Sequence, residues 1–166
     1  MGFELTRLPH ASLEAAIAKA EHYRDLNQPE EAESICRDVI DVDTAYAKAW
    51  KLLGLALTDR FASGQVGLLE EAVLAFERLP DAYERIYHIG VAWERAAKAH
   101  VERGEAHSAV TAFEHALDLF EQAERLRPDL PDPILRWNRC VRLLQTHPHL
   151  RAAIDSPRED QVHLGD

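Results

Sequence analysis

Hydrophobic residues recur three or four positions apart along nearly the whole chain, and polar residues fill the positions between them. This spacing is typical of amphipathic α-helices that bury one face. No segment shows the sustained alternation of apolar and polar residues that a half-buried β-strand requires. The pattern therefore predicts an all-α fold.

Capping residues, prolines and glycines divide this pattern into seven expected helices. Ser12 can cap the first, and Pro29 can begin the second because its missing N–H would be unpaired at a helix start. Asp43 or Thr44 caps the third. The other four are expected at about 68–78, from the D-x-x-E box at 81–84 to 103, at 105–126, and from Pro133 to 145. Short links between the helices predict stacked antiparallel hairpins.

Two motifs spaced for one helical hairpin indicate an internal repeat of about 34 residues. Trp50-Lys51-Leu52-Leu53-Gly54 fits W-x2-L-G, and the segment 72–76 in the next helix fits A-x3-F. A first unit in register is more degenerate, and a third has longer helices. Their marker residues are Ala20, Tyr23, Ala32 and Cys36 in the first unit, and Gly90, Trp93, Ala109, Phe113, Ala116 and Pro128 in the third. Residues 12–146 thus resemble the tetratricopeptide repeat (TPR) family.

This resemblance implies an α-solenoid of about three TPR-like units plus a capping helix from Pro133 to Gln145, with an arm at 1–11. The tail, 147–166, is expected to be mobile beyond one short turn. Small residues where helices cross let the backbones approach, and a large side chain fills the hollow one turn along. The expected close-approach positions are Ala20, Gly54 and Gly90, and the matching plugs are Cys36, Phe76 and Phe113.

The charge of the chain narrows the classes of partner. Acidic residues outnumber basic ones by 29 to 19, a formal net charge of −10, which argues against nucleic acid or an anionic membrane surface as the main partner. Cys36 and Cys140 lie far apart without a CxxC motif, so reduced thiols and a cytoplasmic location are expected. No segment has an apolar run of membrane-spanning length, and the first ten residues lack the basic and apolar stretches of an export signal, so we expect a protein that is not exported.

Candidate catalytic and metal-binding patterns are weak. Glu84 and His88 share a helix face, but the sequence has no HExxH, no nucleophile elbow and no phosphate-binding glycine loop with its lysine. We therefore expect no enzyme activity, no cofactor and no metal site.

The resemblance implies that the first helix of each hairpin lines a concave groove that receives a segment of a partner protein. Carrying the register over gives a mixed groove, with apolar residues between lysines at one end and arginines at the other. The expected partner-binding residues are Lys48, Lys51, Leu55, Tyr87, Val91, Glu94, Arg136, Arg139 and Arg142. A partner segment with apolar anchor residues and flanking acidic residues would suit this groove.

The leading hypothesis from sequence is thus a non-enzymatic adaptor or chaperone-like module. One alternative is an obligate homodimer, or a structural subunit of a larger assembly, that buries Leu13, Ile17 and Ile40 against another chain. Another is a helical metal-binding protein or enzyme that uses Glu84, His88 and Glu94.

Overall fold

The structure is a computed structural model that describes residues 2–156. These residues contain eight α-helices, two short 3-10 helices and no β-strand, so the prediction of an all-α fold is confirmed. The α-helices are α1 (Leu13–Asp25), α2 (Pro29–Val42), α3 (Ala47–Thr58), α4 (Leu68–Glu77), α5 (Ala82–Glu102), α6 (Ala106–Leu126), α7 (Asp132–Thr146) and α8 (Pro148–Asp155). None of them has the length and apolar character needed to cross a membrane.

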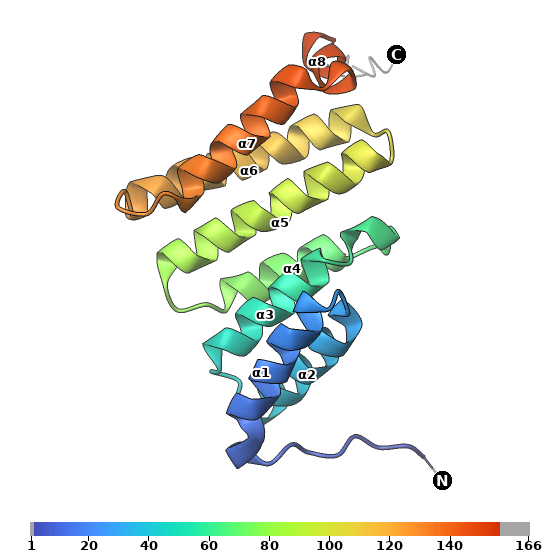
Figure 1. The fold of residues 1–166 in the computed structure, drawn as a ribbon, viewed down its shortest axis with the longest axis vertical. Helices are drawn as coiled ribbons and strands as arrows, with labels where there is room; N and C mark the ends of the chain where they lie inside the picture. The colour runs from blue at the N-terminus through green and yellow to red at the C-terminus, as the bar shows by residue number, and fades with distance from the viewer. Residues whose placement is uncertain (1, 157–166) are drawn as a thin grey trace, which may run out of the picture.

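The helices form an elongated stack in chain order, with the N-terminal arm at one end and α8 at the other (Figure 1). Each helix packs against the next one along the chain. In addition α1 contacts α3, and α3 contacts α5. In Figure 1 these helices and α7 lie on the near side, and α2, α4 and α6 lie behind them. The odd-numbered helices therefore share one face of the molecule, which we call the odd-helix face.

Some helix ends use the residues that the sequence pattern singled out, and two do not. Ser12 precedes α1 but its side chain makes no capping hydrogen bond, and the residue before α3 is Tyr46, not the predicted Asp43 or Thr44. Asp81 caps α5 by accepting a hydrogen bond from the backbone N–H of Glu84 at 2.9 Å, as the D-x-x-E box predicts. Pro29 stands at the first position of α2. Gly104 adopts a left-handed φ of 74° between α5 and α6, a conformation that most residues avoid.

Glycines mark two close contacts between helices. An added Cβ at Gly54 would lie 2.4 Å from the ring of Phe76, so the predicted pairing of these two residues is confirmed. At Gly90 the facing ring belongs to Phe120, which a Cβ would approach to 2.8 Å, and not to the predicted plug, Phe113. Counted from this contact along the antiparallel helices, Phe113 falls opposite Ala97, two turns further along α5, and both residues belong to one apolar cluster.

The core consists of two apolar clusters, and α5 contributes to both. Ala92, Ala96 and Ala99 face the cluster formed with α1–α4. Val91 and Ala97 belong to the cluster that includes Phe113, Phe120, Cys140 and Leu150. The helix is therefore buried on two sides, and its small alanines allow close packing on both.

The chain continues after α7 as an eighth helix, which differs from the expected single turn. α8 packs against α6 and α7, and it buries Leu150 and Ala153. His107 in α6 also donates from Nε2 to the carbonyl oxygen of Ser156 at 2.9 Å. The mobility predicted for the rest of the tail, residues 157–166, lies outside the described residues.

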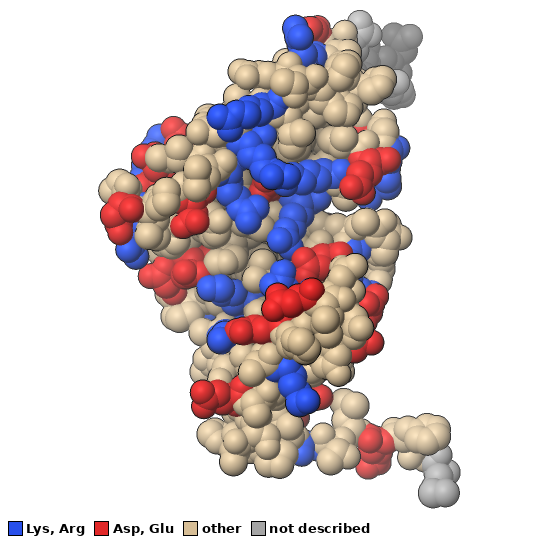
Figure 2. All heavy atoms as spheres, viewed as in Figure 1, with Lys and Arg blue, Asp and Glu red and all other residues tan. Residues whose placement is uncertain are grey.

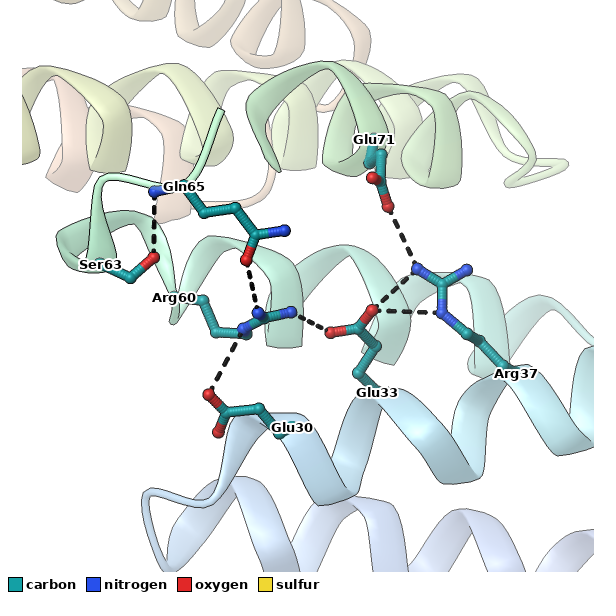
Figure 3. A network of polar contacts seen from close by, with 7 residues as sticks. All are labelled: Glu30, Glu33, Arg37, Arg60, Ser63, Gln65 and Glu71. Carbon is teal, nitrogen blue, oxygen red and sulfur yellow. Dashed lines mark hydrogen bonds and ion pairs between the residues drawn. The ribbon is translucent and has the colours of Figure 1, made fainter. Parts of the chain in front are cut away.

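An ion-pair network fixes the connection between α3 and α4 against α2 (Figure 3). Arg60 donates to Glu33 in α2 at 2.5 Å and to Gln65 at 2.8 Å. Arg37 contacts Glu33 at 2.8 Å and Glu71 in α4 at 3.1 Å. Arg60 is the better buried of the two arginines, with a side chain only 18% exposed, so its pairing with Glu33 contributes more to stability than exposed surface pairs do.

Candidate partner-binding face

The odd-helix face holds all nine predicted partner-binding residues, but only some of them are available to a partner. Lys48 pairs with Glu21 of α1 at 2.5 Å, and Lys51 pairs with Glu84 of α5 at 3.3 Å. Both lysines therefore already bind carboxylates of this chain. Leu55 and Tyr87 are half-buried.

Val91 and Glu94 lie in the interior, which corrects their expected place in an open groove. Val91 is 1% exposed and Glu94 is 0% exposed. Neither is therefore accessible to a partner. Arg136 of α7 reaches towards α5 and donates to Tyr87 Oη at 3.0 Å and to Glu94 Oε2 at 2.6 Å.

Glu94 is the best-buried charged residue of this face, and each of its two carboxylate oxygens accepts a hydrogen bond from a cationic side chain. Arg136 donates to Oε2, and Lys98 donates to Oε1 at 2.9 Å. Each of these cations keeps about a third of its side chain exposed, at 32%. The buried carboxylate thus holds two cationic groups at the surface in fixed positions.

A second group of charges joins α1, α3 and α5. Asp59 follows α3 and accepts from Arg24 of α1 at 2.8 Å and from Arg95 of α5 at 2.7 Å. Burial lowers the pKa of Arg95, and the charge of Asp59 opposes this effect. The sequence pattern contains no signal for this group, because the two arginines lie 35 and 36 residues from Asp59 along the chain.

Arg139 and Arg142 of α7 are exposed, and within residues 2–156 neither has an ion-pair partner. They line an open hollow of about 620 Å³ at the α5–α7 end of the face. We call it the cationic hollow; its residues are Lys98, Leu135, Arg136, Arg139, Arg142, Leu143 and Thr146. Figure 2 shows Lys and Arg side chains gathered in a band over this part of the molecule.

Glu84 and His88 form the only contact of the proposed metal triad that the described residues contain. His88 Nδ1 lies 2.8 Å from the carbonyl oxygen of Glu84 and 3.2 Å from its carboxylate. Glu94 is instead bound by Arg136 and Lys98. Among residues 2–156 no group of three or more His, Cys, Asp or Glu side chains is arranged to hold a metal ion.

Both cysteines are buried and unpaired. Burial raises the pKa of Cys36 and that of Cys140 to about 12. At neutral pH both thiols are therefore protonated, which makes them apolar packing groups and poor nucleophiles.

Comparison with known proteins does not assign the chain to a family. It matches no model of a protein family, and no curated protein is significantly similar to it in sequence.

Proposed function

We propose that the protein is a non-enzymatic adaptor, built from TPR-like helical hairpins, that binds a segment of a partner protein on its odd-helix face. The resemblance to the TPR family implies this use of the first helices of each hairpin. The contact between Gly54 and Phe76 supports it, because it joins the two motifs on which the resemblance rests.

The observation that carries the proposal is the cationic hollow on the odd-helix face. The other predicted cations of this face, Lys48, Lys51 and Arg136, are paired with carboxylates of the chain. Arg139 and Arg142 remain exposed beside Leu135, a leucine whose surface is 61% exposed. Charged and apolar groups that are accessible together in one concave place are typical of a site for a protein segment.

The obligate homodimer that the sequence offered as an alternative is less well supported. Of the three residues that were expected to be covered by another chain, Leu13 and Ile17 are 4% and 2% exposed within this one, and Ile40 is partly buried. They pack in the cluster formed by α1–α4. These residues therefore need no second subunit to remove them from water.

Site-specific photo-crosslinking tests the proposal with two matched positions. Benzoylphenylalanine replaces Leu135 in the cationic hollow in one variant and Leu74 of α4 in the other. The two leucines are equally exposed, at 61% and 62%, but Leu74 lies on a helix of the opposite face. In cells of the source organism we expect a covalent adduct with a partner protein at position 135 and none at 74. Absence of an adduct at 135, or equal adducts at both positions, would contradict the proposal.

A further inference from the structure

The cationic hollow has a charge opposite to that of the whole chain. It is lined by four cations, Lys98, Arg136, Arg139 and Arg142, and by no acidic residue. Even with the buried Glu94 counted against them, the local charge is 4 − 1 = +3. The chain as a whole carries −10. A local excess of this kind attracts negatively charged groups and orients them.

Two of these cations are held in place before any ligand arrives. Glu94 binds Arg136 and Lys98 through separate oxygens, and Tyr87 fixes the Nε of Arg136 at 3.0 Å. A ligand therefore does not have to order these side chains, which reduces the entropic cost of binding. Arg139 and Arg142 add charges that no described residue neutralises.

The hollow also offers apolar surface. Leu135 is 61% exposed at its edge, and Leu143 is a half-buried lining residue. A ligand with charge alone would leave this surface in water. A ligand that carries an aliphatic side chain between its acidic groups would cover it and gain binding free energy.

The surroundings of the hollow disfavour a long polyanion such as a nucleic acid. Another hollow of about 490 Å³ on the odd-helix face is lined by Glu21, Asp81 and Glu84 as well as by Lys48 and Lys51. A phosphate backbone that extended along the face from α7 to α3 and α1 would meet these carboxylates. Of the predicted partner-binding cations, only Arg139 and Arg142 have no ion-pair partner within residues 2–156, and both lie at the α7 end of the face, which suits a short acidic segment.

We propose that the cationic hollow binds an acidic peptide segment of the partner, in which glutamate or aspartate side chains flank a leucine-like residue. The acidic side chains pair with Arg139, Arg142 and the exposed parts of Lys98 and Arg136. The aliphatic side chain packs on Leu135 and Leu143. This inference rests on the proposed function and specifies the chemistry of the partner.

The test uses fluorescence anisotropy with two labelled peptides, Gly-Glu-Glu-Leu-Glu-Glu-Leu-Gly and its counterpart with glutamine in place of every glutamate. The full chain should bind the glutamate peptide, and higher salt should weaken binding. The variant R139E/R142E should bind it at least about tenfold more weakly. The control R7E/R125E makes the same change in net charge at arginines outside the hollow, with side chains 67% and 70% exposed. It should stay within about twofold of the unmodified chain.

Three outcomes would overturn the inference. They are equal binding of the two peptides, equal weakening by R139E/R142E and R7E/R125E, and binding of a single-stranded oligothymidylate as tight as that of the glutamate peptide. Circular dichroism of each variant verifies that it is folded. A partner adduct at position 135 combined with equal binding of the two peptides would leave the proposed function standing and remove only its acidic partner.

Discussion

Glu94 and His88 are two buried titratable side chains of α5 with different electrostatic surroundings. Glu94 is fully buried but bound by two cations, so its negative charge is compensated. His88 is 8% exposed and lies between the rings of Phe76 and Tyr87. Burial lowers the pKa of His88, the carboxylate of Glu84 opposes that shift, and the nearby cations Lys51 and Arg136 add to it. The neutral imidazole is therefore the form that suits the folded state.

This arrangement predicts that His88 makes the protein less stable in mild acid. Because its pKa is lower in the folded chain than the ordinary value of 6.5, the unfolded chain binds more protons as the pH falls below about 6.5. The stabilising contribution is present above that pH and is lost as the pH falls towards the folded pKa. His88→Gln keeps a donor for the carbonyl of Glu84 and removes the titration.

Urea unfolding between pH 7.5 and 5.5 measures this effect. The free energy of unfolding of the unmodified chain should fall by up to about 1.4 kcal/mol more than that of His88→Gln over this range. Parallel pH profiles for the two proteins would show that His88 does not contribute in this way.

At the scale of elements, α8 completes the end of the stack. Leu150 is 1% exposed and belongs to the apolar cluster of α6 and α7, whereas its neighbour His149 is exposed. A helix of 8 residues is too short to be stable alone, so its helical state depends on this packing.

Leu150→Ala should weaken the docking of α8 by about 2 kcal/mol or more, because it removes buried methyl groups and leaves a cavity. Hydrogen exchange of the α8 backbone amides measures this loss, since it reports local opening free energies. His149→Ala shortens an exposed side chain at the next position and should leave the exchange nearly unchanged. Equal exchange in both variants would mean that Leu150 does not hold the helix in place.

The parts of the fold that could be predicted from sequence depend on local signals. The cap at Asp81 and the contact of Gly54 with Phe76 follow from spacings within one helix start or one hairpin. The contact of Gly90 with Phe120 was missed because residues seven apart share a helix face, so long helices offer two registers for one motif.

The candidate site was predicted less completely, because the exposure of its residues depends on how the helices pack in three dimensions. The register placed Val91 and Glu94 on the groove side, but it does not contain the packing that buries them. Arg139 and Arg142 are exposed on α7, one of the helices to which the register assigned the groove. The sequence could not show which cations of the face lack an ion-pair partner. This depends on which carboxylates Lys48, Lys51 and Arg136 bind in the folded chain.

At the scale of the whole molecule, α5 couples the two ends of the stack. Its alanines at 92, 96 and 99 face the cluster of α1–α4, and residues 91 and 97 face the cluster of α6–α8. A stack of helices whose contacts are all between neighbours could unfold in parts. Here the shared helix cannot unfold without exposing both clusters, so the two ends should lose structure together.

Single-tryptophan variants make this prediction measurable, because each end has its own probe. W93F/W137F keeps Trp50 in α3, and W50F/W93F keeps Trp137 in α7. After correction for the stability difference between the variants, obtained from far-ultraviolet circular dichroism, both fluorescence transitions in urea should coincide with the loss of helix. A Trp137 transition at lower urea than the loss of total helix would instead show that α6–α8 unfold first. In that case the cationic hollow between α5 and α7 would be lost while α1–α4 remain folded, and the binding proposed for this hollow would fail before the chain unfolds as a whole.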